Sequence, residues 1–251
     1  MIAATGPARG SVGRLRVTAS TPLTPAMLRL TVAVDEPHLP LDPSGPNQVL
    51  RLSPPDPDAG ALATSGARPA SRTYTVRRAD PGSGLLDIDV ALHGDGLFVR
   101  WACAAAPGDL LDFTGPRPHA VPSFEADAVV MATDETGLPA LAAVVEAAPS
   151  GLAVHAVVEV PDAAEEQPLV SAADLRVTWL HRDGAAAGTT GALERAIRSL
   201  DWPAGAVDVW IAGEAGEVRA ARRFAQIERG VERERLHAFG YWRLGRAGSP
   251  G

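Results

Sequence analysis

The chain has 251 residues, 46% of them hydrophobic, which is enough for one large domain or two modest domains that each bury a core. A formal net charge of −7 argues against nucleic acid as the main partner. The single cysteine, Cys103, excludes an internal disulfide and a cysteine-cluster metal site. The 6 histidines lack metal-binding spacing, so no protein-held metal is expected. No apolar stretch suits a secretory signal or a membrane span, which predicts a cytoplasmic protein without membrane insertion.

The first half of the chain is typical of β-strands. Around Leu30 and Ile88, large apolar residues alternate with polar ones, the period-2 pattern of a half-buried strand. Pro- and Gly-rich turns separate the candidate strands, and residues 53–71 are expected to form a long loop. This pattern predicts a six-stranded antiparallel barrel. The predicted strands are residues 15–19, 28–34, 48–52, 72–77, 86–92 and 110–114.

After residue 124 the pattern changes to strands that alternate with helices. Such alternation predicts a parallel sheet covered by helices on both faces. We therefore expect two domains, at residues 1–123 and 124–251. The predicted strands are residues 128–132, 152–160, 176–180 and 207–212, and the predicted helices are residues 139–148, 190–200 and 217–229.

The segment Arg72-Thr73-Tyr74-Thr75-Val76-Arg77 is the sharpest local motif. Alternation along a strand places Arg72 and Tyr74 on one face and Thr75 and Arg77 on the other. A flavin dinucleotide needs a permanent cation for its phosphates, a flat partner for its ring and a hydrogen bond near the reactive nitrogen, which Arg, Tyr and Thr can supply. The alternative is an ordinary barrel strand with an exposed arginine and a half-buried tyrosine.

A second motif, His93-Gly94-Asp95-Gly96, follows the predicted strand 86–92 and precedes a short helix expected to run through Trp101. Its two glycines allow backbone N–H groups to approach an anion, and the N-terminus of the following helix favours phosphate. A plain turn is the alternative interpretation.

Together these motifs resemble the siderophore-interacting protein family, and the resemblance covers most of the chain. No single motif is specific, but their order and spacing are. The matching segments are residues 72–77, 92–96, 100–102, 107–109, 115–117, 134–140, 179–182, 212–215 and 239–243.

The resemblance implies a ferredoxin–NADP reductase-like plan, with an FAD-binding barrel followed by an α/β domain for NADPH or NADH. It implies that Tyr74 and Thr75 lie at the reacting ring, as the candidate catalytic residues. Arg182 is placed to recognise a 2′-phosphate, and Thr133, where the family tends to have glycine, is expected to crowd the nucleotide. The residues implied to bind the two cofactors are Arg72, Tyr74, Thr75, His93, Gly94, Gly96, Asp134, Glu135, Thr136 and Glu214.

The activity that the resemblance implies is transfer of electrons from NAD(P)H, or from a ferredoxin, through FAD to a ferric siderophore, with release of ferrous iron. Arg243 and Arg246 are the candidate siderophore-binding residues, with Arg100 and Arg117 as further candidates, because many ferric siderophores are anionic. Two alternatives stay open. One is a flavin-dependent tailoring enzyme for another small molecule, and the other is a protein that binds a siderophore or flavin without turnover.

Overall fold

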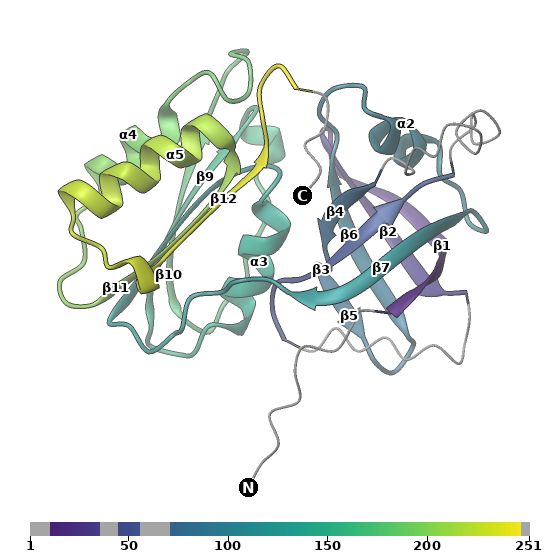
Figure 1. Ribbon diagram of the computed structural model, residues 1–251, viewed down its shortest axis with the longest axis horizontal. Helices are drawn as coiled ribbons and strands as arrows, with labels where there is room; N and C mark the ends of the chain where they lie inside the picture. Colours follow the sequence, from purple (N-terminus) through teal and green to yellow (C-terminus); the bar gives the residue numbers. More distant parts are fainter. Residues whose placement is uncertain (1–10, 36–44, 56–70, 247–251) are drawn as a thin grey trace, which may run out of the picture.

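A computed structural model describes residues 11–35, 45–55 and 71–246 of the chain. Two domains lie side by side, one built on an antiparallel sheet and the other on a parallel sheet (Figure 1). Most of the predicted loop at residues 53–71 falls outside the described residues. In the described part of the chain, no helix has both the length and the apolar composition needed to cross a membrane.

The first domain is a barrel in which all neighbouring strands are antiparallel. Its sheet has 7 strands in the order β4-β3-β7-β1-β2-β6-β5. The strands are β1 (Ser11–Thr24), β2 (Met27–Val34), β3 (Gln48–Ser53), β4 (Arg72–Thr75), β5 (Arg78–Asp80), β6 (Leu85–Ala91) and β7 (Leu110–Pro118).

The strand predicted at residues 72–77 ends at Thr75 in the structure, and a second strand that was not predicted, β5, begins at Arg78. β4 pairs with β3 at one edge of the sheet, whereas β5 pairs with β6 at the other edge. Val76 and Arg77 connect them. A single short segment therefore takes part at both edges, which curls the sheet into a barrel and raises the strand count above the predicted six.

The predicted alternation in the barrel is confirmed. Leu30, Val32 and Ile88 point inward and are fully buried. On the outer face of the same pair of strands, Arg29 donates to Asp89 at 2.7 Å, directly opposite it in the β2–β6 register. Burial on one face and cross-strand ion pairing on the other stabilise one register, since a shift by one residue would exchange the two faces.

The second domain has a fully parallel sheet of 5 strands in the order β10-β9-β8-β11-β12. α3 covers the sheet face toward the barrel, and α4 and α5 cover the other face (Figure 1). The predicted elements of this half are confirmed. They are β8 (Ala128–Asp134), α3 (Leu138–Ala147), β9 (Ala153–Val160), β10 (Asp174–His181), α4 (Ala192–Ser199), β11 (Val207–Glu214) and α5 (Ala215–Arg223), which a π-helix, η2 (Phe224–Glu228), extends.

The edge strand β12 (Leu236–Trp242) was not predicted. Its residues are only partly buried, and Gly240 interrupts the apolar pattern. Gly240 is needed because a Cβ there would lie 3.0 Å from Cβ of Ala215. The strand forms because β11 offers it a parallel ladder, and that partner is not visible in the local sequence.

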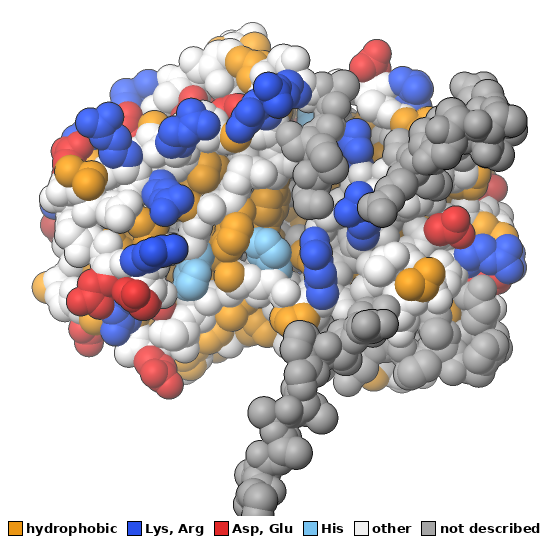
Figure 2. Space-filling model, viewed as in Figure 1, with side chains coloured by type: hydrophobic (Ala, Val, Ile, Leu, Met, Phe, Trp, Pro, Cys, Tyr) orange, Lys and Arg blue, Asp and Glu red, His pale blue; other side chains and the backbone are white. Residues whose placement is uncertain are grey.

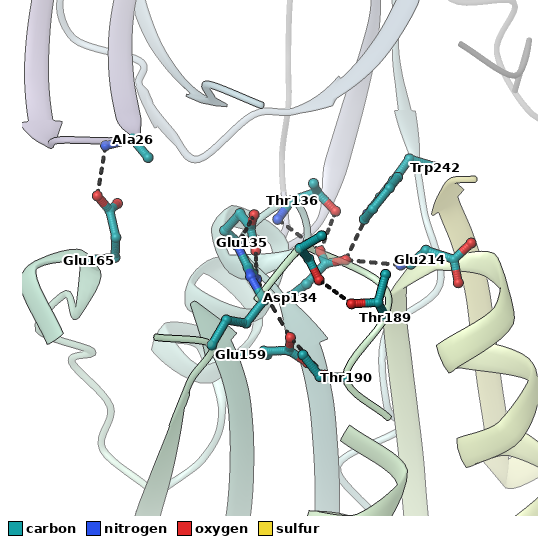
Figure 3. A network of polar contacts seen from close by, with 12 residues as sticks. Ala26, Asp134, Glu135, Thr136, Glu159, Glu165, Thr189, Thr190, Glu214 and Trp242 are labelled. Atoms are coloured by element: carbon teal, nitrogen blue, oxygen red, sulfur yellow. Dashed lines mark hydrogen bonds and ion pairs between the residues drawn. The ribbon is translucent and has the colours of Figure 1, made fainter. Parts of the chain in front are cut away.

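Apolar packing, an ion pair and hydrogen bonds join the domains. Met27 and Ala91 of the barrel belong to the same buried apolar cluster as the inner face of α3. Arg77 binds Glu146 of α3 through two hydrogen bonds of 2.8 and 2.6 Å. Glu165, in the short helix η1 (Ala163–Glu165), accepts hydrogen bonds from the backbone N–H of Ala26 at 2.8 Å and from Thr24 at 2.5 Å (Figure 3). These contacts hold the two domains in one relative position.

Candidate functional site

A cavity of about 650 Å³ lies between the two domains. Its barrel side is formed by β4, the turn at residues 93–96 and the start of α2 (Leu97–Ala104). Its other side is formed by β12, Thr136 and Pro139. Figure 2 shows the hollow between the domains with hydrophobic and histidine side chains inside it and arginines along the barrel side.

Residues of β4 line the cavity from Arg72 to Thr75. Both faces of this strand contribute because β4 is the edge strand of its sheet, so the predicted division into two faces does not separate these four residues. Arg72 donates one hydrogen bond to the carbonyl of Ser71 at 2.8 Å, and its other guanidinium donors have no partner among the described residues. An arginine held in this way is available to an anionic ligand.

Tyr74 supplies an aromatic surface beside Arg72. Its ring stacks on Phe98 of α2, with a centroid distance of 4.3 Å and an interplanar angle of 29°. Burial raises the pKa of the Tyr74 phenol, which therefore stays protonated and can donate a hydrogen bond. Thr75, the predicted hydrogen-bonding partner of a flavin ring, is buried at the cavity wall.

The turn at residues 93–96 and the start of α2, together called the cradle, line the cavity. Gly94 has a φ of +67°, which favours glycine, and a Cβ on Gly94 or Gly96 would meet nothing within 4 Å. Gly96 caps α2 without a side-chain hydrogen bond, so no side chain of the turn occupies the first N–H groups of the helix. Val99 also lines the cavity at this wall.

These features of the cavity wall fit FAD. Arg72 and the cradle suit the diphosphate, and Tyr74 and Thr75 suit the ring. When bound, FAD supplies the ability to accept a hydride and to pass on single electrons. The groups that fit FAD all line the same cavity.

The opposite wall of the cavity is aromatic. Trp242 lies 5.6 Å, between ring centroids, from His93 of the barrel. The hydroxyl of Tyr241 is buried without a hydrogen-bond partner in the described part of the chain. Burial, and then the charge of Asp134, raise the pKa of Tyr241, so the phenol remains neutral.

Asp134, expected to face the nicotinamide nucleotide, is buried behind this wall (Figure 3). Its carboxylate accepts from the backbone N–H of Glu214 at 2.9 Å, from the Trp242 indole at 2.7 Å, and from the Thr136 N–H and hydroxyl at 2.9 and 2.5 Å. Burial, and then the neighbouring Glu135, raise the pKa of Asp134, while the hydrogen bonds from Thr136 and Trp242 oppose that rise. Asp134 therefore joins the ends of β8, β11 and β12.

Glu135 and Glu214 also lie outside the cavity lining. Glu135 forms two hydrogen bonds of 2.7 Å with Arg182, whose side chain is only 6% exposed. The expectation that Arg182 recognises a 2′-phosphate is not supported, because its guanidinium is held by Glu135 in the buried interior. Glu214 caps α5 by accepting from the backbone N–H groups of Gly216 and Glu217.

Thr133, which was expected to crowd the nucleotide, does not line the cavity. Thr133 is fully buried beneath Gly137, where a Cβ would lie 2.0 Å from the threonine hydroxyl. Of the two C-terminal arginines, Arg246 lines the cavity and Arg243 does not. Thr136 is the member of the 134–136 group that reaches the cavity.

His119, a cavity residue, was not predicted as a binding residue, whereas Arg117 was one of the arginines expected to attract the siderophore. Arg117 lies in the last barrel strand, β7, and His119 follows that strand directly. Arg117 pairs with Val49 across the sheet, and Val49 pairs with Thr75 on its other side. Only this strand order brings residue 117 near residue 75.

The comparisons with known proteins agree with this arrangement. A family described as "Siderophore-interacting FAD-binding domain" matches residues 16–120, and one described as "Siderophore-interacting protein" matches residues 126–245. A crystal structure of a siderophore utilization protein from T. fusca superposes with a TM-score of 0.86 at 37% identity, covering 98% of this chain and 97% of that one.

Two named relatives are reductases. The ferric vibriobactin reductase ViuB of Vibrio cholerae is 32% identical over 182 residues, which are 71% of this chain and 66% of that protein. The NADPH-dependent ferric-chelate reductase of Escherichia coli is 31% identical over 202 residues, 75% of this chain and 76% of that one. The chain belongs to the siderophore-interacting protein family of FAD-binding oxidoreductases.

Proposed function

We propose that this chain passes electrons from NADPH or NADH, through FAD, to a ferric siderophore and releases ferrous iron. The observation that carries the proposal is the interdomain cavity, whose barrel wall fits FAD and whose lining includes Arg117 and Arg246. The relatives named as ferric vibriobactin reductase and NADPH-dependent ferric-chelate reductase support the substrate class and the type of donor. We expect the reaction in the cytoplasm, where reduced nicotinamide nucleotides are kept.

We further propose a domain boundary at residues 123/124, supported by the end of β7 at Pro118 and the start of β8 at Ala128. In this division the first domain holds FAD, through Arg72, Tyr74, Thr75 and the cradle. The second domain supplies Thr136 and the aromatic wall, and the Asp134 network keeps that wall in place.

The chemistry requires a mediator because a nicotinamide gives two electrons as a hydride, whereas ferric iron accepts one. The chain's own contribution is to bind, orient and attract. Tyr74 and Thr75 orient the ring, and the arginines lower the energy of an anionic chelate in the cavity. Ferrous iron is held less tightly than ferric iron by oxygen-rich ligands, so reduction favours release.

The direct test uses the FAD-loaded protein under anaerobic conditions. Stopped-flow absorbance records flavin bleaching by NADPH, by NADH and by a reduced ferredoxin, and a coloured chelator traps ferrous iron from catecholate, hydroxamate and citrate complexes. We expect a nicotinamide to bleach the flavin and at least one complex to yield ferrous iron. Bleaching without ferrous iron from any complex would contradict the siderophore assignment and favour a tailoring enzyme. Bleaching by the reduced ferredoxin alone would identify a ferredoxin, instead of a nicotinamide, as the electron donor.

The arginines provide a matched pair of variants. Arg246→Gln is expected to raise the apparent KM for an anionic chelate severalfold, whereas Arg243→Gln, outside the cavity lining, should have a smaller effect. The turnover of the native protein should also fall as salt rises past ~0.1 M, where the Debye length is about 10 Å. Equal effects of the two variants would argue against Arg246 as a contact of the chelate.

A further inference from the structure

His119 is a cavity residue whose position is fixed from three sides. Its backbone N–H donates to the carbonyl of Asn47 at 3.0 Å. Its ring meets Phe239 of β12 edge-on, with centroids 4.3 Å apart, and lies 6.2 Å from the ring of Tyr241. The imidazole therefore belongs to the aromatic wall, on the cavity side of the segment that links the two domains.

The surroundings also determine which ring nitrogen carries the proton. Nδ2 of the fully buried Asn47 donates to the carbonyl of Ala120 at 2.8 Å, and a carbonyl can only accept, so the amide orientation is set. The same Nδ2 lies 3.5 Å from Nδ1 of His119, at the long end for a hydrogen bond. Nδ1 must then act as the acceptor, which leaves the hydrogen of the neutral ring on Nε2. Nε2 has no partner in the described part of the chain.

The charges around His119 favour an anionic ligand. Arg72, Arg117 and Arg246 line the same cavity. Of the two carboxylates at the wall, Asp89 is 4% exposed and bound to Arg29 at 2.7 Å, and Asp95 lies in the turn beyond Gly94. The cavity thus offers more cationic than free anionic groups.

Burial, and then the charge of Arg117, lower the pKa of His119 from its usual value of 6.5. The ring is therefore neutral at neutral pH and gains its charge only in more acidic solution. On the facing strand β12, Tyr241 stays neutral because burial raises its pKa. The other titratable groups on the cavity wall are Tyr74, His93, Asp89 and Asp95. Burial raises the pKa of Tyr74, which stays neutral, and the arginines remain charged.

We propose that His119 contacts the ferric chelate directly, its Nε2–H donating a hydrogen bond to a negatively charged oxygen of the siderophore. This inference rests on the proposed function and adds a residue and a pH response to it. Protonation of His119 adds a positive charge to the cavity, so a chelate with a negative charge binds more tightly as pH falls, whereas an uncharged chelate does not.

The experiment uses two replacements. His119→Gln keeps an N–H donor but cannot titrate, and His119→Leu loses both properties. The probes are a triply negative tris-catecholate and an uncharged tris-hydroxamate, each as the reducible ferric complex and as the redox-inert gallium(III) complex. Binding of the gallium complexes is followed by intrinsic tryptophan fluorescence, to which the cavity residue Trp242 contributes as one of 5 tryptophans. KM and kcat are measured with the ferric complexes between pH 5 and 8.

In the native protein, we expect the Kd and KM for the catecholate to fall severalfold from pH 8 to pH 5. His119→Gln should bind nearly normally at pH 8 but lose most of this pH dependence. His119→Leu should weaken binding about tenfold, the expected effect of losing one hydrogen bond to a charged group. Flavin content and the rate of flavin bleaching should not change. His155→Gln is the matched control, because burial also lowers the pKa of His155, which lies outside the cavity lining.

The outcomes separate the two proposals. If the native protein reduces no ferric complex and binds no gallium complex, the proposed function is wrong. If the native protein binds and reduces the catecholate but both His119 variants do so with unchanged Kd and pH profile, the role of His119 is wrong. A loss of flavin content or slower bleaching in His119→Gln would also overturn it, since it would place His119 at FAD instead of at the chelate.

Discussion

Arg72 and Arg77 lie five positions apart in one motif but make different contacts. Arg72 stays in the cavity with most of its donors available, whereas Arg77 leaves the barrel and binds Glu146 of α3. The divergence follows from the break between β4 and β5, which turns Val76 inward and Arg77 toward the second domain. Residue type alone therefore does not assign an arginine to the cofactor.

This difference predicts the behaviour of two alanine variants. Arg72→Ala should weaken FAD binding by roughly 10- to 100-fold, the cost of a lost hydrogen bond to a charged phosphate. Arg77→Ala should leave FAD affinity nearly unchanged. Fluorescence titration of the apoprotein with FAD measures both, and equal losses in the two variants would show that the role given to Arg72 is wrong.

At the scale of the elements, Asp134 adds side-chain hydrogen bonds to the parallel ladder at the carboxyl ends of β8, β11 and β12. Gly213 has a φ of +137°, and a Cβ on it would lie 2.6 Å from the Asp134 carboxylate. Glycine is thus required for the close approach, and the carboxylate holds the strand ends together in addition to the backbone ladder. The Trp242 side chain of the cavity wall depends on this single residue.

We predict that Asp134→Asn is destabilised by about 2–4 kcal/mol, since a buried amide has one acceptor oxygen where the carboxylate has two, and its NH₂ group faces N–H donors. The Trp242 fluorescence should change with it. Denaturant unfolding measures the free energy, with Asp174→Asn on the exposed start of β10 as a control expected to change it by about 0.5 kcal/mol or less. Similar stability of the two variants would contradict the bridging role of Asp134.

For the whole molecule, the cavity exists only because contacts between the two domains hold them in one relative position. Arg77–Glu146 fixes α3 against the barrel, and Glu165 fixes η1 against the β1–β2 turn. Both contacts join a charged side chain of one domain to a partner in the other, and Met27 and Ala91 fill the apolar space between them. Loosening these contacts should widen the cavity without unfolding either domain.

Accordingly, the double variant Arg77→Ala/Glu165→Ala should separate thermal unfolding into two transitions, one for each domain. The loss of four hydrogen bonds across the interface reduces the coupling between cores that are otherwise distinct. Differential scanning calorimetry records this against the native protein. A single sharp transition at a lower temperature would mean that the apolar contact alone couples the domains.

The same interface predicts a pH dependence. The hydrogen bond from Arg77 lowers the pKa of Glu146 below its usual 4.5. A depressed carboxyl pKa stabilises the fold above the unfolded pKa, and this contribution disappears as pH falls through the folded pKa. The native protein should therefore lose more stability than Glu146→Gln between about pH 5 and pH 3, as measured by urea unfolding. Parallel stability curves for the two proteins would contradict this.

The sequence by itself determined the order of the elements, because alternation and helical periodicity are local properties. The alternation of apolar and polar residues around Leu30 and Ile88 is visible in the sequence without any knowledge of the fold. The same holds for the alternation of strand and helix patterns after residue 124. It also determined the family, through the order of short motifs, and the cavity wall formed by Arg72, Tyr74 and Thr75.

Only the tertiary structure decided which polar groups face the cavity. Asp134, Glu135 and Glu214 belong to the motifs but turn into the protein, because nearby N–H donors satisfy them there together with the distant Trp242 and Arg182. The strand β12 and the position of His119 in the cavity both depend on partners in other elements. A buried charge takes the orientation in which its hydrogen bonds are satisfied, and those partners are assembled only when the chain folds.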